Sequence, residues 1–169
     1  MIRSITNCIA AVLLCILVTN SYSLNNDGVT ISKTAGGYDV QYTLPGYNSN
    51  IGTGEGEQYI VLNIDNYGIT PAEGLPMLPQ ISFNLILNTS ETSPGFDITS
   101  QSTEEKYLSN KIFPAQAPWE KSKDLKDRPF TINRAYYATT GSINSPIVSI
   151  SEPFIIAGVK AVTVTITPF

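Results

Sequence analysis

The chain contains no histidine, and its two cysteines, Cys8 and Cys15, both stand close to its start. Ser-His-Asp and Cys-His catalysis each need an imidazole base, so neither can operate within this chain alone. Zinc and copper sites draw on the same side chains, so the usual ligand sets for these metals are excluded as well. Since the carboxylates also lack the setting that catalysis needs, we predict a protein that is not an enzyme and that carries no catalytic residue, cofactor or bound metal.

Carboxylates are the remaining groups that could do acid–base chemistry. Glu55 and Glu57, like Glu104 and Glu105, stand in turn-like contexts without an apolar pocket that would raise a pKa, as hydrolysis by paired carboxylates requires. We interpret them as solvated charges. The stretch Asp65–Gly68 lacks the further carboxylates that a calcium-binding loop uses.

The densest group of charges lies between Pro114 and Pro129. Each proline restricts the residue before it to extended backbone, and an extended loop with isolated basic side chains is what an enzyme selective for basic residues would recognise. A solvated surface loop is the simpler interpretation of the same composition, and both stay open. The candidate binding residues of this loop are Trp119, Lys121, Lys123, Lys126 and Arg128.

Aromatic side chains offer a second kind of surface. Tyr38, Tyr42, Tyr47 and Trp119 could stack on sugar rings. Alternating tyrosines on a strand, however, are more often core residues or cross-strand pairs. An exported adhesin-like or glycan-binding domain that uses Tyr47 and Trp119 is therefore the alternative function.

Strands must position these side chains, because period-two alternation recurs along the chain and helical periodicity does not. We predict a hairpin of two strands across Ala35–Gly37, turns over Pro45–Glu57, and no helix. The fold class that follows is all-β, an antiparallel β-sandwich that is jelly-roll-like or a partly open barrel. The predicted strands are Val29–Ser32, Tyr38–Leu44, Tyr59–Ile64, Ile81–Leu87, Phe96–Thr99, Lys106–Leu108, Ile147–Ile150, Phe154–Ile156 and Val159–Thr167.

The last of these strands has no turn, polar tail or partner strand after it. We therefore expect Val162–Ile166 to be an exposed edge. An exposed apolar edge is an aggregation hazard.

Residues 1–23 have the features of a secretory signal peptide. A single positive charge precedes the apolar stretch Ile5–Val18, which is too short for a membrane span of about twenty residues, and cleavage is expected after Ser23. Residues 24–169 then form one domain, secreted, periplasmic or on the cell surface. The net charge of −4 argues against a nucleic-acid partner.

Several segments resemble the N-terminal propeptide of gingipain-type cysteine peptidases, the C25 family. They are Gly74–Pro79 before a strand, the loop from Pro114 to Phe130, the Tyr136-Tyr137 pair, and Glu152–Lys160 with its closing strand. The C-terminal third is the most specific part. In that family a return strand and then the peptidase domain follow, so the resemblance implies a domain truncated at its C-terminal hairpin.

The resemblance implies a β-sandwich that inhibits a cysteine endopeptidase and helps it to fold. It also implies that the partner is the peptidase catalytic domain, in cis in the family and in trans here. By the same resemblance, a basic side chain of the loop is expected to enter the specificity pocket, and the residue at the matching position is Lys121. Arg128, which stands where the family has an apolar residue before the proline, is the second candidate. A truncated product without independent function is a third interpretation of the whole chain.

Overall fold

The structure is a computed structural model that describes residues 21–24, 28–88, 94–124, 127–139, 143 and 146–169. Most of the predicted signal peptide, residues 1–20, therefore lies outside the described residues. Ser21–Leu24 forms strand β1, which pairs with the strand that follows it. Within the described part of the chain, no helix is long and apolar enough to cross a membrane.

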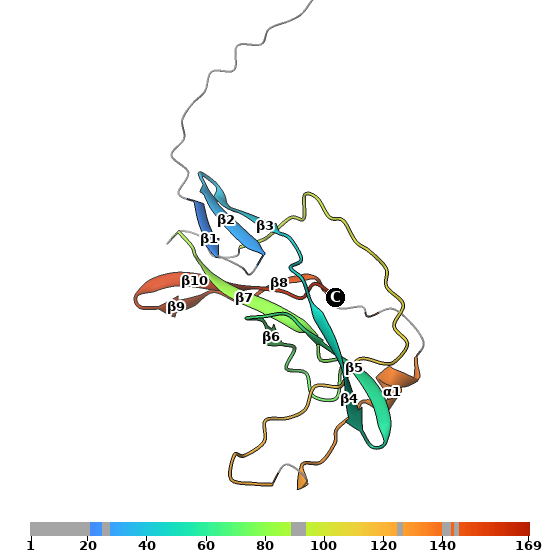
Figure 1. The fold of residues 1–169 in the computed structure, drawn as a ribbon. Helices are drawn as coiled ribbons and strands as arrows, with labels where there is room; N and C mark the ends of the chain where they lie inside the picture. The colour runs from blue at the N-terminus through green and yellow to red at the C-terminus, as the bar shows by residue number, and fades with distance from the viewer. Residues whose placement is uncertain (1–20, 25–27, 89–93, 125–126, 140–142, 144–145) are drawn as a thin grey trace, which may run out of the picture.

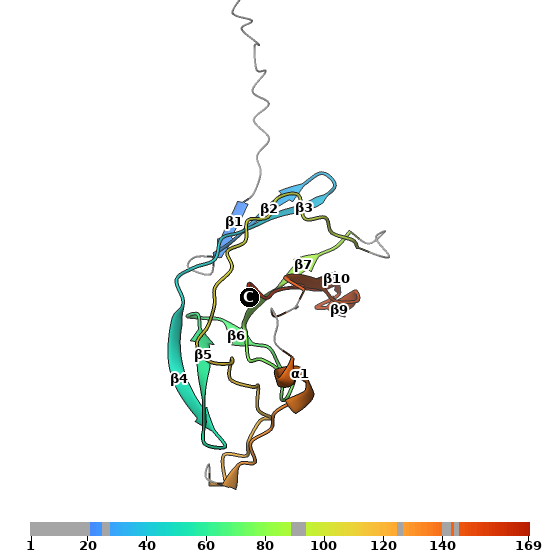
Figure 2. The same ribbon diagram turned by 90° about the vertical axis from the view of Figure 1, so that its right-hand side faces the viewer.

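Two antiparallel sheets stack on each other and form a β-sandwich (Figures 1 and 2). One has the order β1-β2-β3, with β2 at Val29–Thr34 and β3 at Gly37–Tyr42. The other has the order β6-β7-β10-β8, and β9 also pairs with β10. Its strands are β6 Gly68–Ile69, β7 Pro79–Ile86, β8 Val148–Ile150, β9 Phe154–Ile156 and β10 Val159–Ile166. The predicted all-β, antiparallel fold class is confirmed.

The core of the sandwich draws on both sheets. Val29 of β2 is buried against Ile81 of β7 and against Val164 and Ile166 of β10. Period-two alternation places these side chains on the inner faces, where the removal of apolar surface from water holds the layers together.

A separate hairpin lies beside the sandwich. It consists of β4 (Asn48–Gly54) and β5 (Glu57–Asn63), and the short helix α1 (Arg134–Ala138) lies close to it (Figure 1). Ile60 and Leu62 of β5 are buried with Leu78 and Ile112 in a second apolar cluster. This part of the molecule carries the Pro114–Pro129 loop.

Three predictions about secondary structure were wrong. Pro45–Glu57 is mostly strand β4, and only Glu55-Gly56 turns, with positive φ at both residues. The described residues 94–108 form no strand, so the predicted strands Phe96–Thr99 and Lys106–Leu108 are absent. Phe96 and Ile98 are about half exposed, so the side chains of this segment do not pack against a sheet as those of a half-buried strand would. Helix α1 was not foreseen, since five residues are too few for a visible helical period.

The expectation of an exposed final edge was also wrong. Strand β10 lies inside its sheet, with β7 on one side and β8 and β9 on the other. It is the second arm of a hairpin with β9 that turns at Ala157-Gly158, both with positive φ. Val162, Val164 and Ile166 are buried, so this strand does not present the predicted aggregation hazard.

Candidate functional site

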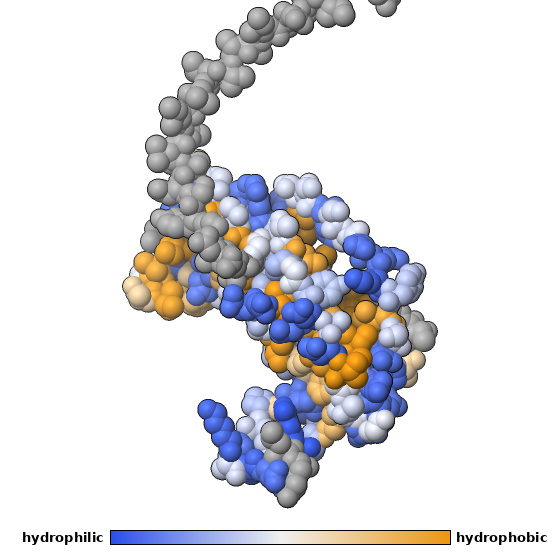
Figure 3. Space-filling view, viewed as in Figure 1, coloured by the Kyte–Doolittle hydropathy of each residue, from blue (hydrophilic) through white to orange (hydrophobic). Residues whose placement is uncertain are grey.

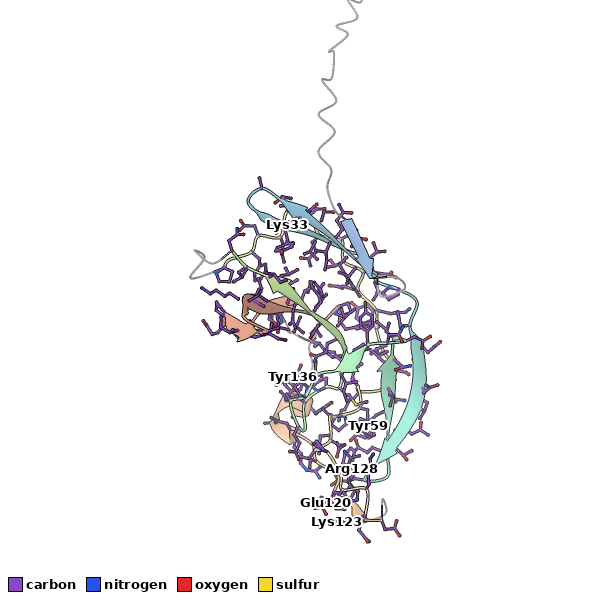
Figure 4. All side chains as sticks on the ribbon, turned by 90° about the vertical axis from the view of Figure 1, so that its left-hand side faces the viewer. Lys33, Tyr59, Glu120, Lys123, Arg128 and Tyr136 are labelled. Atoms are coloured by element: carbon purple, nitrogen blue, oxygen red, sulfur yellow. The ribbon has the colours of Figure 1, made fainter. Side chains whose placement is uncertain are left out.

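The basic loop projects from the body of the molecule, away from both sheets (Figure 1). We call its described residues, 117–124 with 127 and 128, the arm. Figure 3 shows that the surface of this projection is mainly hydrophilic. Glu120, Lys123 and Arg128 all lie at this end of the molecule, whereas Lys33 lies at the opposite end (Figure 4).

Two backbone segments meet at the base of the arm, and the Gln116 side chain joins them. Its amide nitrogen donates to the carbonyl of Thr131 at 2.8 Å, and its Oε1 accepts from the N–H of Thr131 at 2.9 Å. The amide thus replaces a pair of backbone hydrogen bonds. Ala115 in turn donates to the Leu75 carbonyl and accepts from Gly74, so the proline-rich segment before β7 anchors the base.

An aromatic cluster lies beneath the base. The ring of Tyr59, only 2% exposed, has its centroid 5.8 Å from that of Phe113, 5.7 Å from that of Phe130 and 6.5 Å from that of Tyr137. Burial raises the pKa of both tyrosines above its ordinary value, so the hydroxyls stay neutral. Because Phe130 lies two residues after the arm, the cluster fixes where the chain re-enters the body.

Gly54 leaves room for this cluster. A Cβ at Gly54 would stand 2.2 Å from the ring of Phe130. We expect Gly54→Ala to reduce the free energy of unfolding in urea by about 1–3 kcal/mol, the usual cost of overpacking. Gly95→Ala, which adds a Cβ to open space, is the control and should change it by less than ~0.5 kcal/mol. Equal effects of the two substitutions would contradict this packing.

Lys121 lies at the apex of the arm. The N–H of Lys123 donates to the carbonyl of Glu120 at 3.0 Å, which makes Lys121 and Ser122 the two central residues of a β-turn. The Lys121 side chain is exposed. Among the described residues it has no hydrogen-bond or ion-pair partner.

The other candidate residues of the loop have partners within it. Lys123 forms an ion pair with Glu120 at 2.8 Å and lies 5.4 Å from the centroid of the Trp119 ring. The Trp119 indole N–H donates to the Asp124 carbonyl at 3.2 Å. The guanidinium of Arg128, which is half-buried, donates to the carbonyl of Ala117. Lys126 lies outside the described residues.

The tyrosines of the proposed sugar platform do not gather with Trp119. Tyr47 packs edge-on against Phe169 at 5.3 Å and accepts a hydrogen bond from Lys106 at 2.8 Å. Tyr42 pairs with Tyr67 in the sandwich core, and the Tyr38 hydroxyl donates to the Ile86 carbonyl. These contacts give the three tyrosines structural roles, and Trp119 belongs to the arm.

Most of the chain matches a known protein family. Residues 57–169 match the family model described as Propeptide_C25. No curated protein sequence matches the chain.

Two solved structures from Porphyromonas gingivalis share its fold. One concerns the zymogenic latency of gingipain K, with a TM-score of 0.68 and 20% identity over 89% of this chain and 85% of that one. The other is the complex of the RgpB pro- and mature domains, with a TM-score of 0.73 and 19% identity over 85% of this chain and 74% of that one. At these identities the similarity shows the fold alone.

Proposed function

Since the chain belongs to the C25 propeptide family, we propose that it binds and inhibits a gingipain-like cysteine endopeptidase by presenting Lys121 to the specificity pocket of that enzyme. The observation that carries the proposal is the exposed apex of the arm. Lys121 stands there without a partner among the described residues, whereas Lys123 and Arg128 are engaged inside the arm. The choice of Lys121 over Arg128 rests on this difference.

Electrostatics favours a pocket of one kind. The Lys ammonium is a compact point charge that suits a buried carboxylate, while Arg would offer a planar fork of donors for two-point binding. We therefore propose a partner that accepts lysine. Because the arm is held by several contacts, it loses little conformational entropy when it docks.

The two similar structures support a peptidase as the partner of this chain. One similar structure is a complex of pro- and mature domains, and the other concerns zymogen latency. For this chain we propose the same kind of partner, bound in trans. Binding that favours the folded peptidase would also assist its folding by mass action.

Export is part of the proposal. Removal of residues 1–23 by a signal peptidase would take Ser21–Ser23 away from β1 and leave β2 and β3 as the lasting part of that sheet. The domain would then meet its peptidase outside the cytoplasm.

The test measures inhibition directly. The purified chain is titrated into gingipain K, with a fluorogenic substrate that carries lysine before the cleaved bond. We expect competitive inhibition at micromolar concentration or below. No inhibition at micromolar concentration would overturn the proposal, and inhibition that does not depend on substrate concentration would contradict occupation of the pocket.

A further inference from the structure

The contacts of the arm are nested, as the rungs of a hairpin would be, although the arm contains no strand. Each one joins a residue on the outgoing side to a residue on the returning side, and most use a side chain on one side and backbone on the other. From base to apex they join Gln116 to Thr131, Arg128 to Ala117, Trp119 to Asp124, and Lys123 to Glu120.

These contacts hold the Lys121–Ser122 peptide bond in a turn conformation. The bond lies in the middle of the turn closed by Glu120 and Lys123. Endopeptidases bind the residues around a scissile bond as extended backbone, which the turn does not provide. Small displacements from a reactive geometry cost large factors in rate.

We propose that Arg128 and Trp119 are positioning residues that keep the arm closed, so that Lys121 can fill a lysine-accepting pocket while the bond that follows it resists hydrolysis. The inference rests on the proposed function and deepens it, because it says what separates an inhibitor from a substrate at the same residue. When these hydrogen bonds break, the backbone at Lys121 and Ser122 can become extended. Water then adds across the amide and leaves a carboxylate on Lys121 and an amine on Ser122.

The hydrogen bond of Arg128 contributes most to holding the arm closed. Its guanidinium donates a charge-assisted hydrogen bond to the Ala117 carbonyl and is half-buried. Trp119 supports the outer half of the arm through its indole N–H and through its ring face, over which the Lys123 ammonium lies. Neither residue contacts the bond that it protects.

Limited proteolysis with a lysine-specific serine endopeptidase unrelated to the C25 family tests the inference. Mass spectrometry follows the cleavage after Lys121 and, in the same chain, the cleavage after Lys106. Lys106 lies in an exposed segment that precedes Ile112, the residue that forms a β-bridge with Ile60 of β5. Cleavage rates follow the population of open arm. We expect Arg128→Ala to raise the rate after Lys121 roughly tenfold, since it removes a charged hydrogen bond, and to leave the rate after Lys106 unchanged.

Two further variants sharpen the test. Trp119→Phe keeps a ring for Lys123 but loses the donor to Asp124, and should raise cleavage after Lys121 several-fold. Arg134→Ala removes an exposed cation that pairs with Glu55 outside the arm, and should change neither rate. Unchanged cleavage after Lys121 in both arm variants would overturn the inference, as would an equal rise at Lys106, which reports general unfolding.

The outcome is separable from that of the inhibition assay, because the probe enzyme needs no docking surface of the C25 kind. Arg128→Ala could speed cleavage after Lys121 while the unaltered chain fails to inhibit gingipain K. That result would support the positioning role of Arg128 and reject the proposed function. Inhibition without any effect of the arm variants on cleavage would reject only the positioning role of Arg128 and Trp119.

Discussion

Replacing Lys121 by alanine is expected to raise the inhibition constant against a lysine-accepting C25 peptidase by roughly 30-fold or more. Truncating one partner of a buried charge pair costs about 2–5 kcal/mol, and each 1.4 kcal/mol is about a factor of ten in affinity. The pocket carboxylate that we propose would be left desolvated and unpaired. A titration series at several substrate concentrations gives the constant.

Lys33→Ala is the matched control for this experiment. It removes the same charge from an exposed position on β2, at the end of the molecule opposite the arm (Figure 4), and should leave the inhibition constant within about twofold, since rim and remote charges contribute little to affinity. A Lys121→Ala chain that inhibits as well as the unaltered chain would assign the pocket to another residue, with Arg128 the next to test.

The second large effect is expected in the aromatic cluster. Tyr59→Ala should lower the free energy of unfolding by about 3–5 kcal/mol, the range found when buried aromatic side chains are truncated. Tyr59 is 2% exposed and contacts three other rings, so its removal leaves a cavity beneath the arm. Urea unfolding followed by tryptophan fluorescence and by circular dichroism measures the change.

Tyr59→Phe separates the ring from the hydroxyl. It removes only the hydrogen bond that the hydroxyl donates to Glu57 at 3.2 Å, and should cost about 1 kcal/mol or less. If the two substitutions destabilised the chain equally, the hydroxyl and not the ring packing would hold the cluster together.

Local patterns were enough to predict the regular part of the fold. The hairpin of β2 and β3 follows from alternating β-formers around Ala35–Gly37, and β5 and β7 follow from their apolar runs. Strand β4 escaped prediction because Gly52 and Gly54, which usually mark turns, are there to make room for Phe113 and Phe130. Such a requirement depends on residues far along the chain.

Of the candidate site, the sequence predicts the proline-bounded loop that carries it, and the role of Lys121 stays a proposal. The resemblance to a family pointed to Lys121 within a proline-bounded loop, and its exposure agrees with that role. The contribution of Gln116 could not be predicted, because its amide acts on the backbone of Thr131, 15 residues away, and no local pattern marks such a bond. The role that we propose for Arg128 likewise depends on a carbonyl across the arm.

The position of β10 bears on how the molecule reaches its native state. Its partner β7 lies much earlier in the chain, and Ile81 must meet Ile166 before the larger sheet exists. Pairings of such long sequence separation give a high contact order and slow folding. Until they form, the backbone groups of β7 that face β10 lack their partners, so a chaperone that shields this edge would act during that interval, before β10 pairs with it.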